Sequence, residues 1–94
     1  MTIKAYILFK VNSGTEGDVC RKLADFDEVL DASIIYGEYD LMALVSVQEI
    51  EDLHKLLEKI RGIPSIILTS TMIIAKQYKG RNKINTLKAM EKLK

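Results

Sequence analysis

The chain has 94 residues, 48% of them apolar, which is enough for one globular domain with a single hydrophobic core. Its longest apolar run is only a few residues, which excludes a membrane-spanning segment. Because the formal net charge is only +1, we do not expect the whole surface of the protein to bind nucleic acid. The single cysteine, Cys20, cannot form an internal disulfide, and the N-terminus lacks the pattern of a signal peptide, so we expect a cytoplasmic protein.

The charge is unevenly distributed along the chain. Residues 77–94 hold six Lys or Arg side chains and one Glu, whereas residues 1–76 carry a net charge of −4. Gly80 interrupts the chain early in this basic part, and Thr86–Lys94 has the weak apolar spacing of a short helix. We therefore predict a domain over residues 1–76 and a basic C-terminal extension over residues 77–94.

The first predicted element is a strand over Ile3–Val11, in which one side chain in two is directed to the same apolar face. Asn12-Ser13-Gly14 ends it, and Thr15 stands where the N-cap of a helix belongs. The apolar face of that helix comprises Val19, Leu23 and Phe26. Val29–Tyr36, rich in β-branched residues, predicts the second strand.

The third predicted strand runs from Leu41 to Val47. Ser46 and Glu49 match the Ser-x-x-Glu capping box, so we expect the second helix to begin directly after Ser46, with Val45 and Ile50 as its hydrophobic staple. The predicted apolar stripe comprises Ile50, Leu53, Leu57 and Ile60, and Gly62 and Pro64 end the helix. A fourth strand is expected over Ile66–Ala75.

This β-α-β-β-α-β order predicts an α+β fold, the ferredoxin-like two-layer sandwich, with a four-stranded antiparallel sheet and two helices on one face. The other face should be polar in a monomer, but apolar residues occupy both sides of the strands. An apolar face of this size indicates an interface, and we predict a dimer formed through the sheet. The alternative is that the C-terminal helix folds back over this face.

The turn between the second and third strands carries the clearest binding signal. Gly37 can adopt the positive φ that a short turn needs, and Asp40 follows at the mouth of an apolar strand. A carboxylate beside outward-pointing backbone N–H groups suits a small zwitterion, whose ammonium and carboxylate groups both find partners. The alternative is a turn with no ligand.

Three segments at these separations resemble the Lrp/AsnC regulators. They are Gly37-Glu38-Tyr39-Asp40-Leu41, Ile63-Pro64-Ser65-Ile66 and Thr69-Ser70-Thr71-Met72-Ile73. The chain resembles their ligand-binding domain, in the form of a stand-alone module. The resemblance implies sheet-to-sheet dimers, further assembly into tetramers of dimers, and an amino-acid effector bound between dimers. It also implies a ligand-binding role for Gly37, Tyr39, Asp40, Leu41, Thr69, Ser70 and Thr71.

The chain departs from the family pattern in several places. Whole regulators begin with a helix-turn-helix domain, whereas this chain begins at its first strand, so we expect no operator binding by that route. Ser65 and Asp27 stand where the family commonly has glycine and proline. A DNA-binding Lrp/AsnC paralogue is one candidate partner, and we expect no sequence-specific DNA binding by the chain itself.

Other chemistry finds little support in the residues. His54, the single histidine, is expected on a helix surface with no metal-ligand spacing, and Cys20 is expected to pack in the core. The acidic residues Asp25, Asp27, Glu28 and Asp31 are expected to form a solvated loop. We therefore predict no catalytic residue, metal site or cofactor, and no binding of RNA on the sheet, whose third strand lacks aromatic residues.

The sequence thus predicts a non-enzymatic module that senses an amino acid or a similar metabolite at subunit interfaces and modulates transcription through its oligomeric state or a partner regulator. Two alternatives remain open. One is a structural adaptor that contacts another macromolecule through its basic extension. The other is a small enzyme of the dimeric ferredoxin-like barrel class, which His54 on a helix surface does not favour.

Overall fold

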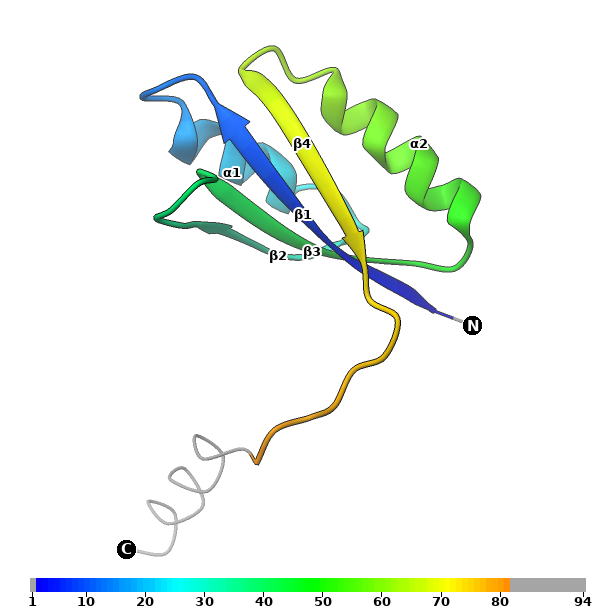
Figure 1. Ribbon diagram of the computed structural model, residues 1–94. Helices are drawn as coiled ribbons and strands as arrows, with labels where there is room; N and C mark the ends of the chain where they lie inside the picture. The colour runs from blue at the N-terminus through cyan, green and yellow to red at the C-terminus, as the bar shows by residue number, and fades with distance from the viewer. Residues whose placement is uncertain (1, 82–94) are drawn as a thin grey trace, which may run out of the picture.

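The computed structural model describes residues 2–81 (Figure 1). Its elements are β1 (Ile3–Val11), α1 (Glu16–Ala24), β2 (Val29–Ile34), β3 (Leu41–Val47), α2 (Ile50–Arg61) and β4 (Ile66–Ile73). The predicted element order is confirmed, although β2 ends at Ile34 and β4 at Ile73, earlier than expected. The predicted helix over Thr86–Lys94 lies outside the described residues.

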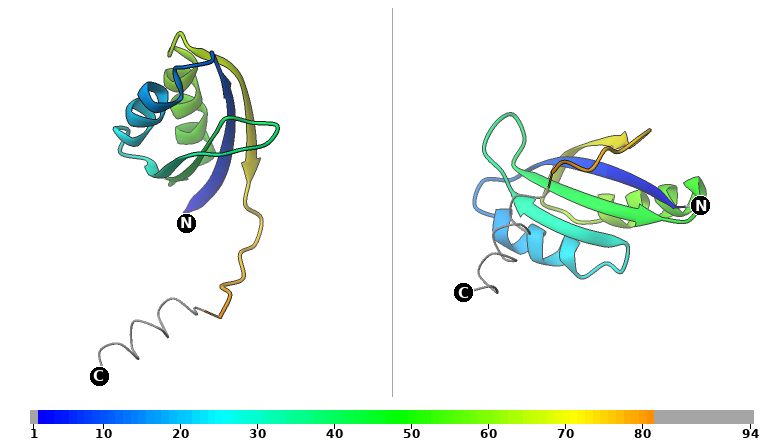
Figure 2. Two further views of the ribbon diagram at one scale, coloured as in Figure 1. Left: turned by 90° about the vertical axis from the view of Figure 1, so that its left-hand side faces the viewer. Right: turned by 90° about the horizontal axis from the view of Figure 1, so that it is seen from below.

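The four strands form one antiparallel sheet in the order β2-β3-β1-β4. Both helices lie on the same face of this sheet, and the opposite face, which we call the open face, is not covered by residues 2–81 (Figure 2). This is the predicted ferredoxin-like arrangement. Neither described helix is long and apolar enough to cross a membrane.

The hydrophobic core lies between the sheet and the helices, because alternate residues of β1 and β3 are directed to the helix side. Its fully buried side chains include Ile7 and Phe9 of β1 and Leu23 of α1. On α2 the buried positions are Leu53, Leu56 and Ile60. Leu56, absent from the predicted stripe, is therefore central, and Ile50 is 54% exposed.

The start of α2 differs from the prediction. Ser46 still belongs to β3, where its N–H donates to the carbonyl of Glu28 at 2.9 Å, so it does not cap the helix. Glu49 is the N-cap residue, and its N–H donates to Oδ2 of Asp52 at 3.2 Å. The predicted capping box and its Val45–Ile50 staple were wrong. Ser46, the expected N-cap, is paired within the sheet instead.

Strand β4 begins with an irregularity that alternation alone does not predict. The register of β1 with β4 shifts between Lys10 and Val11, which places Ile66 opposite Val11 on the helix side. Ile66 therefore packs against the core, whereas simple alternation along β4 would place it with Leu68 on the opposite face. An irregularity of this kind bends the strand where it leaves the 62–65 loop.

Candidate functional site

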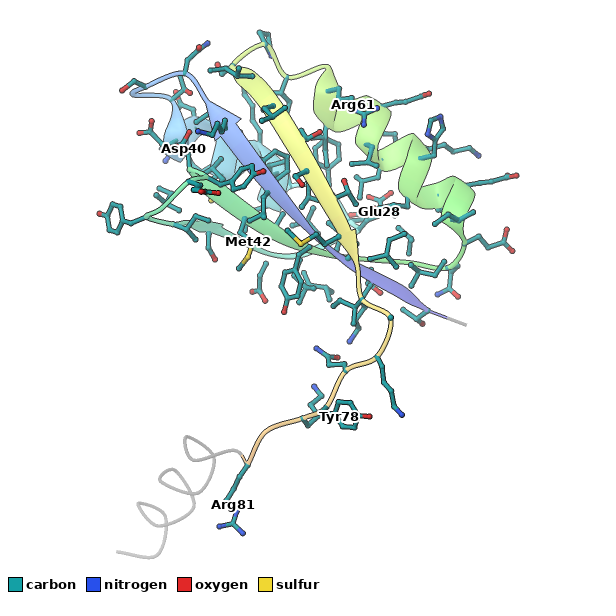
Figure 3. All side chains as sticks on the ribbon, viewed as in Figure 1. Glu28, Asp40, Met42, Arg61, Tyr78 and Arg81 are labelled. Carbon is teal, nitrogen blue, oxygen red and sulfur yellow. The ribbon has the colours of Figure 1, made fainter. Side chains whose placement is uncertain are left out.

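The open face is apolar along its middle. It is formed by Tyr6 and Leu8 of β1, Met42 and Leu44 of β3, and Leu68, Met72 and Ile74 at β4. Met42 is labelled on β3 in Figure 3. Leu68 and Met72 are half exposed, at 50% and 51%. Exposed apolar patches of this kind, formed by large side chains across three strands, are typical of protein–protein interfaces.

Residues 35–40 connect β2 to β3 and curl away from the helix layer toward the open side of the sheet (Figure 2). The N–H of Ile35 donates to the carbonyl of Asp40 at 3.0 Å and closes the loop. Gly37 has φ +145°, and a Cβ there would meet nothing within 4 Å. Backbone conformation rather than space therefore requires glycine, as the sequence predicted.

Asp40 joins this loop to the end of β1, as Figure 3 shows near the tip of that strand. Its N–H donates to the carbonyl of Phe9 at 2.8 Å, and its Oδ2 accepts the N–H of Val11 at 3.0 Å. The Asp40 carboxylate thus continues the ladder of hydrogen bonds past Leu41, where backbone pairing of β1 with β3 ends. Its first role is structural, and within residues 2–81 its Oδ1 has no hydrogen-bond partner.

We expected outward-pointing backbone N–H groups beside the Asp40 carboxylate. The N–H of Asp40 itself is not one of them, because it donates to the carbonyl of Phe9. Within residues 2–81, the N–H groups of Gly37, Glu38 and Tyr39 have no hydrogen-bond partner. Three consecutive donors followed by a carboxylate still form the pair of groups that a zwitterion needs.

The sheet register separates the three predicted residues of β4. Thr69 pairs with Phe9 and Thr71 with Ile7, so both threonines lie on the helix side, half-buried. Ser70 pairs with Leu8 and lies on the open face. One ligand bound on one face of one subunit therefore cannot contact all three side chains.

Distance across the sheet adds a second separation. Leu41 and Thr69 both pair with Phe9, so β1 stands between them and two strand spacings, roughly 10 Å, divide their backbones. The Leu41 side chain is fully buried in the core, so only its backbone can contact a ligand. The loop residues Gly37, Tyr39 and Asp40 form one group, and the β4 residues form another at the same end of the sheet.

The remaining chemistry is sparse among residues 2–81. No group of three or more His, Cys, Asp or Glu side chains is placed to share a metal ion in this part of the chain. His54 lies on the exposed face of α2, with Nε2 2.9 Å from Oε1 of Glu58. Cys20 is half-buried against the core, as expected.

Sequence reasoning missed the partner of Asp40. Nothing in the pattern of Ile3–Val11 marks Val11 as the donor, because the bond depends on where β3 stops pairing. The neighbouring Asn12 N–H donates to the carbonyl of Ser65 at 2.9 Å, which ties the same end of β1 to the 62–65 loop. The only available signal was that an Asp directly before a strand often satisfies a backbone donor.

Solved structures resemble this fold over most of the chain. Hypothetical protein PHS023 from Pyrococcus horikoshii is 40% identical, with a TM-score of 0.74, over 83% of this chain and 94% of its own. FFRP-DM1 is 42% identical, with a TM-score of 0.73, over 77% and 97%. Escherichia coli AsnC is 28% identical, with a TM-score of 0.77, over 85% and 55%.

Sequence comparison gives the same relationship. HTH-type transcriptional regulator FL11 of Pyrococcus abyssi is 32% identical over 75 residues, and its counterpart in Pyrococcus horikoshii is 33% identical. The chain spans about half the length of these curated relatives. The family model for the Lrp/AsnC ligand binding domain matches residues 4–84. The chain therefore belongs to the Lrp/AsnC ligand-binding domain family.

Proposed function

We propose that the protein is a non-enzymatic sensor that binds an amino acid or a similar small zwitterion where its subunits meet. The observation that carries the proposal is the loop 35–40, which presents three unpartnered N–H groups and the Asp40 carboxylate beside an apolar open face. Membership of a ligand-binding family supports it. The relatives that are named as transcriptional regulators suggest that the output is transcription.

The assembly follows from the open face. Burying roughly 600 Å² of apolar surface at about 25 cal/mol per Å² contributes a gross ~15 kcal/mol, at or above the ~4–15 kcal/mol cost of association. A second copy offers the same apolar surface, and in a two-fold pair Leu8 at its centre would meet an equivalent apolar surface. The subunits therefore pair sheet to sheet, and pairs assemble further into a tetramer of dimers.

The ligand site would then include more than one subunit. The N–H groups of Gly37, Glu38 and Tyr39 take the ligand carboxylate, and Oδ1 of Asp40 takes the ammonium. The β4 residues Thr69, Ser70 and Thr71, which one subunit cannot bring to a single ligand, contribute from a neighbouring subunit. This division explains why the two groups of residues are separated within one chain.

Binding alters function by changing the population of assemblies. A ligand that contacts two subunits binds the assembled form better and shifts the equilibrium toward it. The protein acts in the cytoplasm. There the ligand-dependent change in assembly decides whether the sheet face is free to bind a DNA-binding Lrp/AsnC paralogue or is already occupied by another copy. Asp40 is well placed to report occupancy, because it also holds the end of β1 through Val11.

A calorimetric screen of the twenty amino acids tests the sensing proposal. An amino acid at 100 times its Kd adds about 2.7 kcal/mol to the free energy of unfolding, which raises the Tm by several degrees. Asp40→Ala abolishes this shift, whereas Glu38→Ala, which removes a carboxylate from the same loop, leaves it. The absence of a shift from every amino acid at millimolar concentration would refute the proposal.

A further inference from the structure

The sheet has two outer strands, and they differ in charge. Because the strand order is β2-β3-β1-β4, one side of the β2 backbone and one side of the β4 backbone have no strand partner within residues 2–81. β4 contains no charged residue. The chain from residue 25 to the end of β2 holds four carboxylates and no Lys or Arg: Asp25, Asp27, Glu28 and Asp31. An unpaired strand edge is a template for another strand, so the edge of β2 suits an extended segment of positive charge.

The described chain provides such a segment directly after β4. The N–H of Ile74 donates to the carbonyl of Lys4 at 2.9 Å, and residues 75–81 make no further backbone hydrogen bond to the described chain. These residues, which we call the exit segment, are exposed and run away from the domain as an extended segment (Figure 1). They contain Lys76, Lys79 and Arg81 and no acidic residue. Within residues 2–81, the exit segment therefore has positive charge and no partner strand.

The register places the start of β2 and the exit segment at the same end of the sheet. Val29 at the start of β2 pairs with Val45 of β3. Val45 pairs with Ala5 of β1, which pairs in turn with Ile73 at the end of β4. This row crosses the whole sheet, so three strand spacings, roughly 14 Å, separate the edge of β2 from the exit segment of the same subunit.

A second subunit brings the two features closer together. The proposed function pairs the subunits through their open faces, and the present inference rests on that pairing. A two-fold axis that runs along the strands reverses the strand order but not the two ends of the sheet, so β4 of one subunit lies opposite β2 of the other. Packed sheets are about 10 Å apart, whereas seven extended residues span up to roughly 23 Å. The exit segment is therefore long enough to reach the β2 edge of a second copy.

We propose that the exit segment of one subunit adds as a strand to the free edge of β2 in a second copy of the chain. Main-chain hydrogen bonds hold the added strand, and its cations lie beside Asp31 and the carboxylates that precede β2. Tyr78 is 79% exposed, and Leu30 and Ile34 of β2 are 52% and 53% exposed. The added strand therefore also covers apolar side chains that a single subunit leaves in water.

A second copy suits this edge better than other occupants do. In the two-fold pair the exit segment is tethered next to the edge, at an effective concentration of about millimolar, which a separate basic peptide would have to match. The exit segment of the same subunit would have to fold back across its own open face, which is the surface that the second copy covers in the proposed dimer.

Cysteine pairs test the exchange in the full chain, with Cys20→Ser as the background. Tyr78→Cys is combined in turn with a cysteine at each of four exposed β2 positions: Leu30, Asp31, Ser33 and Ile34. We expect mild oxidation to link two chains in the pairs whose Cα atoms come within disulfide distance, so that these variants run at twice the subunit mass without reductant. The control E51C/Y78C places the second thiol on the exposed side of α2, and we expect at least about tenfold less linked dimer.

Lys79→Pro tests the main-chain pairing. Proline removes a backbone donor from the exit segment, which makes no backbone hydrogen bond to its own subunit among the described residues, so the fold is retained. We expect the β2 amides to exchange at least about tenfold faster in Lys79→Pro than in the parent chain, because the edge loses its added strand. Lys79→Gln removes the charge but keeps the N–H, and we expect a smaller increase.

The proposal is overturned by any of three results: a disulfide within one chain, no linked dimer from any of the four pairs, or unchanged exchange of the β2 amides in Lys79→Pro. Sedimentation of the same variants separates these failures from failure of the proposed function. If no pair links while the chain still sediments as a dimer that Leu8→Glu dissociates, the strand exchange is wrong and the pairing of open faces stands. If the unmodified chain sediments as a single subunit, both are wrong.

Discussion

Adjacent residues of β1 show how one strand serves two surfaces. Ile7 has no exposed surface and packs beneath the helices, whereas Leu8 next to it is only half-buried on the open face. Both are large and aliphatic, and both pair with β3 and β4. The difference lies in what covers them: the chain's own helices cover one face, whereas no described element covers the other, where we propose that a second copy packs.

Removing side chains from the two faces gives the largest expected difference. Ile7→Ala leaves a cavity in a sealed core and lowers the free energy of unfolding by about 2–5 kcal/mol. Leu8→Ala lowers the free energy of unfolding of the subunit by roughly 1 kcal/mol or less. Any further loss comes from weaker association and depends on protein concentration. Denaturant unfolding at two protein concentrations measures both. If Ile7→Ala lowers the free energy of unfolding no more than Leu8→Ala does, the two faces do not differ in how they are covered.

A charge on the open face should separate the subunits without unfolding them. Leu8→Glu places a carboxylate at the centre of the proposed interface, where burial without a partner is costly, and we expect dissociation to folded monomers. Ile50→Glu is the matched control, because Ile50 is 54% exposed on α2, away from the sheet face. Light scattering and circular dichroism measure mass and folding. Equal masses for the two variants would show that the open face is not the interface.

The end of β1 offers a second comparison with the core. Asp40, which lies outside the core, accepts a hydrogen bond from the Val11 N–H there. Asp40→Ala leaves the half-buried N–H of Val11 without its acceptor and lowers the free energy of unfolding by about 1–3 kcal/mol. Glu38→Ala, whose side chain makes no hydrogen bond to the described residues, changes it by less than about 0.5 kcal/mol. Thermal unfolding without ligand distinguishes them. If both variants unfold like the parent chain, the bond to Val11 does not contribute.

The smallest expected effect concerns the start of α2. Asp52→Ala removes the acceptor of the Glu49 N–H and lowers the free energy of unfolding by about 0.5–1 kcal/mol. Glu51→Ala removes an equal charge from the same helical turn without that bond, so its loss is smaller. The two thermal unfolding curves, measured side by side, provide the check. A larger loss for Glu51→Ala would mean that charge near the helix terminus outweighs the hydrogen bond.

Periodicity predicted the elements and the two faces well, because the alternation of β1 and β3 depends only on local geometry. It failed where tertiary pairing competes with a local motif. Ser46 matches a helix cap, but its pairing with Glu28 keeps it in β3. Leu56 and Leu57 are both compatible with a helical stripe, and only the position of α2 over the sheet decides that Leu56 is buried.

The candidate site was predicted less completely. Gly37 and Asp40 are visible as a turn, and the positive φ of Gly37 follows from residue type. The hydrogen bond from Val11 to Asp40 joins strands far apart in sequence and needs the register of the sheet. Strand alternation alone puts Thr69 and Thr71 on the face opposite Ser70, but only the register with β1 shows that the two threonines lie on the helix side.

Sedimentation velocity of the unmodified chain at micromolar concentration tests most directly whether the open face pairs with a second copy. The subunit mass is 10.6 kDa. We predict a species of twice that mass or a higher multiple, converted to the subunit mass by Leu8→Glu. A single species at 10.6 kDa for the unmodified chain throughout the micromolar range would contradict the dimer and, with it, a ligand site formed between subunits.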